Sequence, residues 1–105
     1  MTRRTIEVEQ ELHRHAPGHF SLIVTVTDDH LVTSREFTYF KTNRTYPAFK
    51  GLISTLRNYE NVDVLFKTAD DYLKTEINVI RESKGTLAKM LVELLDEKNI
   101  TIKAV

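Results

Sequence analysis

The stretch that decides the fold is Asn61-Val62-Asp63-Val64-Leu65-Phe66-Lys67. It is short and apolar, and polar residues bound it on both sides, which is typical of a strand buried in the middle of a sheet. Before and after it the hydrophobic residues recur at helical spacing, over residues 46–56 and again over residues 72–80. A strand that lies between two helices favours parallel pairing, because parallel strands need a crossover connection.

Further elements are indicated on both sides of this unit. Residues 5–12 alternate apolar and acidic side chains, and residues 19–27 and 31–41 are rich in β-branched and aromatic side chains. A second long amphipathic helix is predicted over residues 86–98, and a period-two strand over residues 100–105. The resulting order, βββαβααβ, predicts an α/β protein with a mixed five-stranded sheet and helices packed on it.

Length and composition narrow the class of protein. The 105 residues fill about one domain, and 15 basic residues balance 15 acidic ones, so we expect a single domain over residues 1–105. The absence of cysteine excludes disulfides, thiolate nucleophiles and sulfur-based zinc sites. No apolar stretch is long enough to cross a membrane, and no hydrophobic leader follows the first residues. We therefore expect a cytoplasmic protein without membrane contact and without a cofactor.

Three strings of sequence resemble the ribonuclease H-like superfamily in their order and spacing. Ala16–Ile23 resembles the Pro-Gly-rich stretch before the family's second strand. Lys41-Thr42-Asn43-Arg44 resembles the Thr-Asn-Asn/Gln-Arg entry to its first helix, and Asp63–Leu73 is similar to its fourth strand, which ends in Thr-Asp-Ser. The resemblance covers nearly the whole chain. It implies a ribonuclease H-like fold and, in nucleases of the family, four carboxylates around two divalent cations.

The carboxylate set that this resemblance implies is incomplete. The ligand of the first strand falls on or near Glu11, the helix ligand falls on about Ala48, and Asp70 comes one residue late after Thr68-Ala69. No acidic residue occurs over residues 37–59, and the sequence ends before the position of the fourth ligand. Two cations need several anionic oxygens, so we expect a pseudo-enzyme with no catalytic residues and no metal site. An enzyme that uses Glu11 and Asp70 with an unusual cation site is the remaining catalytic alternative.

Two other polar groups have structural explanations. Asp70-Asp71 precedes a helical pattern, so we interpret this pair as an N-cap with a first-turn carboxylate that faces the helix dipole. Four histidines could suggest zinc, but they straddle a turn and lack a clear carboxylate partner in the sequence, so we expect surface side chains. These histidines are His13, His15, His19 and His30.

Charge segregation is the strongest functional signal. Residues 37–59 carry four bases and no acids, interleaved with aromatic residues. Basic side chains bind phosphates and exposed aromatic rings stack on bases, so this region predicts contact with single-stranded or hybrid nucleic acid. The residues that we expect to make this contact are Lys41, Thr42, Asn43, Arg44, Lys50 and Arg57.

The alternative function is a protein-interaction or regulatory module, either an inhibitor or a self-associating adaptor, with no nucleic-acid contact. The last helix and the final strand would form its working surface, and a terminal strand at a sheet edge would favour a homodimer. Glu7, Glu9 and Glu11 also place like charges on one face of the first strand, which neighbouring bases or a partner must balance. We expect Arg35, on the third strand, to be one such base.

Overall fold

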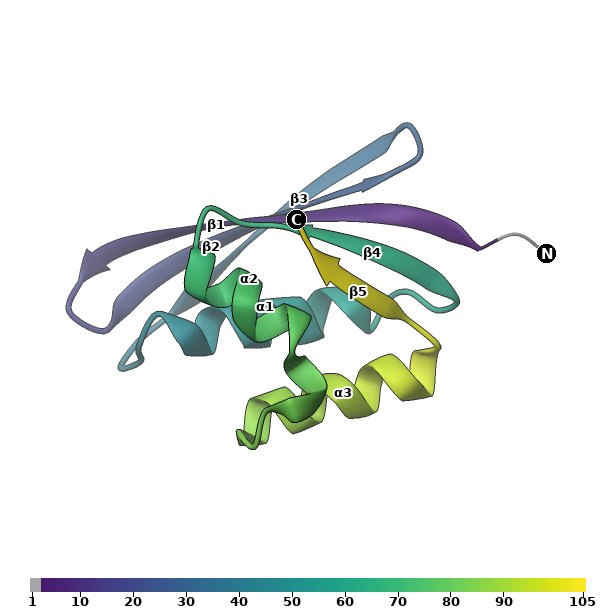
Figure 1. Cartoon of the computed structure of the whole chain (residues 1–105). Helices are drawn as coiled ribbons and strands as arrows, with labels where there is room; N and C mark the ends of the chain where they lie inside the picture. The colour runs from purple at the N-terminus through teal and green to yellow at the C-terminus, as the bar shows by residue number, and fades with distance from the viewer. Residues whose placement is uncertain (1–2) are drawn as a thin grey trace.

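The computed structural model describes residues 3–105, and these residues form one five-stranded sheet with helices packed on it (Figure 1). The predicted order of elements, βββαβααβ, is confirmed. The elements in chain order are β1 (Arg4–Ala16), β2 (His19–Asp28), β3 (Leu31–Tyr39), α1 (Thr45–Leu56), β4 (Val62–Lys67), α2 (Asp71–Asn78), the short 3₁₀ helix η1 (Ile80–Glu82), α3 (Thr86–Lys98) and β5 (Thr101–Ala104).

The sheet is mixed, and its strands lie in the order β3-β2-β1-β4-β5. The pairs β1–β2 and β2–β3 are antiparallel, whereas β1–β4 and β4–β5 are parallel. Figure 1 shows α1, α2 and α3 together on one face of the sheet, with no described helix on the other face. Among the described residues, no helix is long and apolar enough to cross a membrane.

The alternation along β1 separates the two faces of the sheet. Ile6 and Val8 are fully buried against the helices, whereas the glutamates between and after them lie on the open face. The strand is longer than the sequence predicted, because it stays paired with β2 as far as Ala16 opposite His19, with an irregularity after Arg14. The turn therefore consists of residues 17 and 18 alone, and the positive φ of 74° at position 18 requires its glycine.

The prediction that Arg35 balances the glutamates of β1 is wrong. Arg35 pairs with Val24, which faces the helices, and its guanidinium lies 5.3 Å from the centre of the Phe37 ring. The register of β3 thus places this arginine on the opposite side of the sheet. Lys67 is the base that answers these acids, because its Nζ lies 3.2 Å from Glu7 Oε1. His13 Nε2 lies 3.3 Å from Glu11 Oε1 on the same face.

Helix α1 lies close to the sheet at Gly51. A Cβ at this position would overlap the side chain of Leu22, which is fully buried on β2. The close approach brings the backbone of α1 within reach of β1 side chains, and this contact shapes the site described below. At the other end of the core, α3 buries Leu91, Leu94 and Leu95 as its periodicity predicted.

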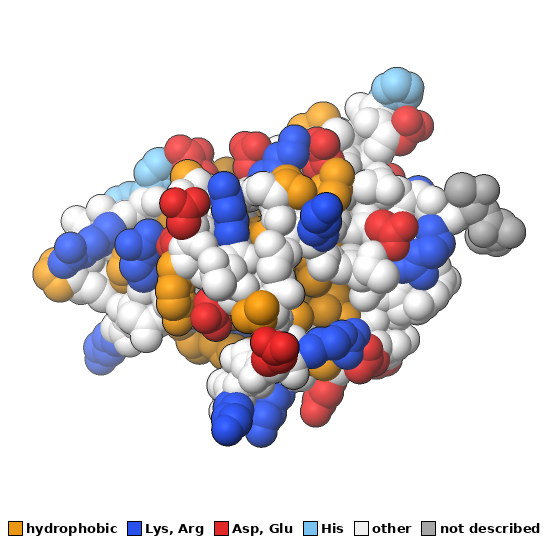
Figure 2. Space-filling model, in the orientation of Figure 1, with side chains coloured by type: hydrophobic (Ala, Val, Ile, Leu, Met, Phe, Trp, Pro, Cys, Tyr) orange, Lys and Arg blue, Asp and Glu red, His pale blue; other side chains and the backbone are white. Residues whose placement is uncertain are grey.

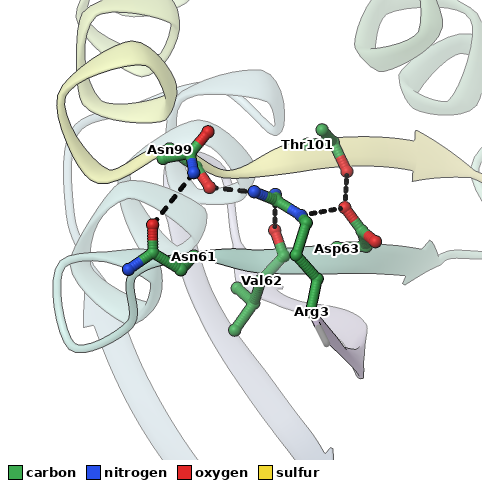
Figure 3. A network of polar contacts seen from close by, with 6 residues as sticks. All are labelled: Arg3, Asn61, Val62, Asp63, Asn99 and Thr101. Carbon is green, nitrogen blue, oxygen red and sulfur yellow. Dashed lines mark hydrogen bonds and ion pairs between the residues drawn. The ribbon is translucent and has the colours of Figure 1, made fainter. Parts of the chain in front are cut away.

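A polar network joins the amino ends of the parallel strands (Figure 3). Arg3 Nε donates to Asp63 Oδ1 at 3.0 Å, and Arg3 Nη2 donates to the backbone oxygens of Val62 and Asn99 at 2.8 and 2.9 Å. Thr101 Oγ1 donates to the same Asp63 oxygen at 2.6 Å. The hydrogen bonds from Thr101 and Arg3 lower the pKa of the Asp63 carboxyl below its ordinary value. This end of the sheet is therefore held by a carboxylate that stays ionised.

Candidate nucleic-acid interface

The carboxyl end of β4 lies beside the middle of β1, because the two strands are parallel and Lys67 pairs with Glu9. The first turns of α1 and α2 face this edge, and these elements, with Leu22 of β2, line a hollow of about 230 Å³. Its polar lining consists of Gln10, Glu11, Arg44, Thr68 and Asp70. This is the edge where the resemblance to ribonuclease H-like nucleases places the cation site.

Gln10, not Glu11, is the β1 residue that faces α1 here, which corrects the position expected from the sequence. Gln10 continues the inward series of Ile6 and Val8 and is only 6% exposed. The side chain of Glu11 is 66% exposed and lies beside His13 on the open face. The strand alternation therefore places an amide, rather than a carboxylate, at the junction with α1.

The amide nitrogen of Gln10 is hydrogen-bonded, whereas its amide oxygen is not. Its Nε2 donates to the backbone oxygen of Ala48 at 3.0 Å, which ties β1 directly to α1. Its Oε1 is buried and has no hydrogen-bond partner among the described residues. The side chain of Ala48 is a methyl group, so α1 brings no anionic oxygen to this edge.

Asp70 caps α2, as predicted from the sequence. Its Oδ1 accepts a hydrogen bond from the backbone N–H of Leu73 at 3.2 Å. Its Oδ2 lies 2.9 Å from Arg44 Nη2, so an ion pair joins the start of α2 to the start of α1. Both oxygens of this carboxylate are thus engaged by protein donors.

These residues do not fit a pair of divalent cations. Such a pair requires several anionic oxygens. The lining offers two carboxylates: Asp70 is already bonded to Arg44, and the Glu11 side chain is 66% exposed and lies beside His13. Over residues 3–105, no group of three or more His, Asp or Glu side chains is arranged to hold a metal ion. The histidines lie elsewhere: His30 is almost fully exposed at the β2–β3 turn, and His15 Nε2 lies 2.7 Å from Ser21 Oγ on β2.

The predicted contact residues fall into two groups. Lys41, Thr42, Asn43 and Arg44 form the loop that enters α1, whereas Lys50 and Arg57 lie on the middle and the end of that helix. Arg57 follows Arg44 by 13 residues. At about 1.5 Å per helical residue, the two lie about 20 Å apart along the axis. The structure therefore brings the loop residues together and extends the basic row along α1.

Local hydrogen bonds fix the loop that enters α1. Arg44 occupies the N-cap position of α1, and the side chain of the preceding Asn43 supplies the capping oxygen. Asn43 Oδ1 accepts from the backbone N–H groups of Thr45 and Tyr46, both at 3.0 Å. The backbone N–H of Thr42 donates to the oxygen of Gly18 at 3.2 Å, which ties the loop to the β1–β2 turn. Lys41 has a positive φ of 55° and an exposed side chain.

Two residues beside this loop were not among the predicted contacts, although Phe40 is one of the aromatic residues interleaved with the four bases. Arg14 lies opposite Phe20 in the β1–β2 hairpin and, with Arg44, lines a second hollow of about 460 Å³. Phe40 is 67% exposed and stacks on His19. Figure 2 shows Lys and Arg side chains gathered at the end of the molecule where this hairpin and the start of α1 lie, whereas acidic and basic side chains mix over the rest of that face. The Pro-Gly turn at residues 17 and 18 is the sequence feature that indicates the place of Arg14, because the chain after this turn runs back beside Arg14.

Comparisons with known proteins identify the fold. LC11-RNase H1, isolated from compost by a metagenomic approach, matches with a TM-score of 0.69 at 12% identity, over 97% of this chain and 84% of that chain. LC11-RNase H1 in complex with an RNA/DNA hybrid matches with a TM-score of 0.67 at 14% identity, over 95% and 84% of the two chains. RNase H1 from the halophilic archaeon Halobacterium salinarum NRC-1 matches with a TM-score of 0.68 at 12% identity, over 96% and 85%.

No family model matches the sequence, and no curated protein matches it either. At these low identities the structural likeness identifies the fold alone. The chain has the ribonuclease H-like fold that its sequence strings predicted.

Proposed function

We propose that this ribonuclease H-like chain is a single domain that binds single-stranded or hybrid nucleic acid and does not cleave it. The proposed contacts come from the loop that enters α1 and from the exposed side of that helix. They are Lys41, Thr42, Asn43, Arg44, Lys50 and Arg57. One structural neighbour of the same fold was solved with an RNA/DNA hybrid, which supports this class of ligand.

The observation that carries the binding proposal is the fixed, exposed and basic entry to α1. The loop is held by its bond to Gly18 and by the Asn43 cap, so its donors need little reordering to meet a phosphate. Lys41 and Arg57 are exposed and Lys50 is half-buried. A row about 20 Å long would span about six nucleotides at 3.4 Å each.

The proposed lack of catalysis follows from the residues at the carboxyl edge. Gln10 holds α1 through an amide, Ala48 offers no ligand, and Asp70 is bonded by Arg44 and by the α2 backbone. Aligning an attack on phosphate with two metal ions needs a cluster of carboxylates, and this set does not provide it.

Binding is tested by fluorescence anisotropy with labelled single strands and an RNA/DNA hybrid of about ten nucleotides. If Lys41, Lys50 and Arg57 each neutralise one phosphate, the logarithm of the association constant for a single strand falls with that of salt with a slope of about −2. A rise from about 50 to about 200 mM salt then lowers affinity about 15-fold. Failure to bind at low salt, or affinity indifferent to salt, would remove the proposal.

Paired variants separate the α1 row from general charge effects. Lys50→Ala with Arg57→Ala removes two proposed contacts, and the slope for a single strand is expected to fall to about −0.7. The matched control, Lys84→Ala with Lys89→Ala, removes two exposed lysines outside the interface and is expected to keep the full slope. An equal loss in both pairs would show that only net charge matters.

Catalysis is tested by incubating the protein with the RNA/DNA hybrid and magnesium or manganese. We expect both strands of the hybrid to stay intact. Cleavage that depends on the metal and disappears in Glu11→Gln or Asp70→Asn would establish the catalytic alternative and overturn this part of the proposal.

A protein-interaction function has one specific observation in its favour. Strand β3 forms an edge of the sheet over nine residues without a bulge, and it begins with Leu31 and Val32, which are 65% and 60% exposed. An edge of this kind can pair with another strand. Sedimentation over a range of concentrations tests for a homodimer, and Val32→Lys would weaken a dimer built on this edge.

A further inference from the structure

A ladder of three rings ends at an exposed phenylalanine beside the α1 entry. The ring centres of His15 and His19 lie 4.8 Å apart, and those of His19 and Phe40 lie 4.4 Å apart with planes at 23°. Phe40 forms the outer end of the ladder and is 67% exposed. Because His19 covers one face of the Phe40 ring, most of the exposed area belongs to its other face and its edge.

Hydrogen bonds hold this ladder in place from two sides. His15 Nε2 lies 2.7 Å from the hydroxyl oxygen of Ser21, which is only 5% exposed, so the inner end of the ladder is anchored on β2. Two residues after Phe40, the Thr42 N–H bonds to the Gly18 oxygen. The outer ring is thus fixed by its stacking partner and by its loop, without being covered.

A basic side chain adjoins this ring. Lys41 follows Phe40 directly and is exposed. Arg14 and Arg44 line a hollow on the helix-facing side of the sheet, because Arg14 pairs with the buried Phe20. The rings are anchored on Ser21, which the alternation of β2 places on the other face. An uncovered aromatic face next to a cation is the combination that binds a base and its phosphate in single-stranded nucleic acids.

We propose that Phe40, backed by His19, is a stacking platform for one unpaired base, and that Lys41 takes the adjoining phosphate. This inference rests on the proposed function and deepens it, because a base can reach the ring face only when it is unpaired. The domain then prefers single strands, or hybrids with a single-stranded overhang, over blunt hybrids of the same length.

The first test measures affinity for a single strand and for a blunt hybrid by anisotropy. Phe40→Ala is expected to weaken single-strand binding about 5- to 150-fold, the range that one base–aromatic stack contributes. Its effect on the blunt hybrid is expected to stay below about twofold, and Phe40→Trp keeps or raises single-strand affinity. Thermal melts of each variant show whether the fold is retained.

The second test observes stacking directly. The sequence contains no tryptophan, so Phe40→Trp introduces a single tryptophan at the proposed platform, which can be excited at wavelengths that tyrosine does not absorb. Its emission is expected to be quenched when a single strand binds. The matched control is Tyr72→Trp on α2, because Tyr72 is 63% exposed and lies outside the ladder, and its emission is expected to stay constant.

The outcomes distinguish this inference from the function on which it rests. If the wild-type protein binds no nucleic acid, both the stacking platform and the proposed binding function are refuted. If it binds with the expected salt dependence, but Phe40→Ala binds single strands as tightly as wild type and Phe40→Trp is not quenched, the platform is refuted and the basic interface stands.

Discussion

Replacing Gln10 with methionine tests whether the Gln10 amide destabilises the fold. The substitution removes the hydrogen bond from Nε2 to the Ala48 oxygen, but this oxygen lies within α1 and keeps its helical partner. It also removes Oε1, a buried acceptor without a partner. Methionine is unbranched and flexible, so it can fill the same space.

The two changes have opposite signs, and their sizes decide the result. Loss of one neutral hydrogen bond costs about 1 kcal/mol, whereas relief of a buried unsatisfied acceptor returns about 1–3 kcal/mol. The net expectation is a gain of about 1 kcal/mol in the free energy of unfolding. For a domain of this size, that gain raises the melting temperature by about 4–8 °C.

Urea titration and thermal melts followed by circular dichroism measure this difference. A loss of more than about 1 kcal/mol would refute the reasoning, because the amide would then stabilise the junction more than its orphaned oxygen destabilises it. Gln10→Glu is the matched control. It places a carboxylate against the Ala48 oxygen, so stability should fall sharply at neutral pH and recover as pH falls toward about 4, where glutamate is protonated and can donate.

Three further predictions concern single contacts. Gly51→Ala should lower stability by about 1 kcal/mol, since overlap with the buried Leu22 side chain outweighs the gain in helix propensity; an unchanged urea midpoint would contradict this. Asp63→Asn should lower the melting temperature at pH 7, because the lowered pKa of Asp63 stabilises the fold only while the carboxyl is ionised. The difference in melting temperature from wild type should disappear as pH falls below 3.8, the ordinary pKa of this carboxyl. A difference that persists in acid would exclude the charge as its cause. Asp70→Asn keeps a capping side chain but removes the charge that balances Arg44. The salt slope for a single strand should therefore steepen by about 0.7, and a slope equal to that of wild type would show that releasing Arg44 neutralises no further phosphate.

The sheet and its helices were predictable because their signals are local. The alternation over β1 and the helical spacing over α3 each depend on one burial direction. The predicted bounds of both elements agree with the observed bounds to within a few residues. The alternation along β1 also indicates that Gln10, rather than Glu11, faces α1. Gln10 shares the parity of Ile6 and Val8, whereas alignment by sequence resemblance pointed to Glu11, one residue away and on the opposite face.

The assembly around Phe40 was not predictable in the same way. It depends on the register of the β1–β2 hairpin, including the irregularity after Arg14, and on the bond from Thr42 to Gly18. Neither feature has a sequence pattern that fixes it. The stacking of His19 on Phe40 joins residues on β2 and after β3, and only the pairing of these strands brings the rings together.

At the carboxyl end of β4, contacts between protein groups join α1 and α2 to the sheet. A cluster of carboxylates would repel α1 from the sheet unless positive ions lay between them. Here an amide donates to the α1 backbone, and an arginine at the start of α1 pairs with the aspartate that caps α2. The same contacts that engage these polar groups therefore join the two helices to the sheet. They help to set the position of α1, which carries Lys50 and the adjoining Arg57.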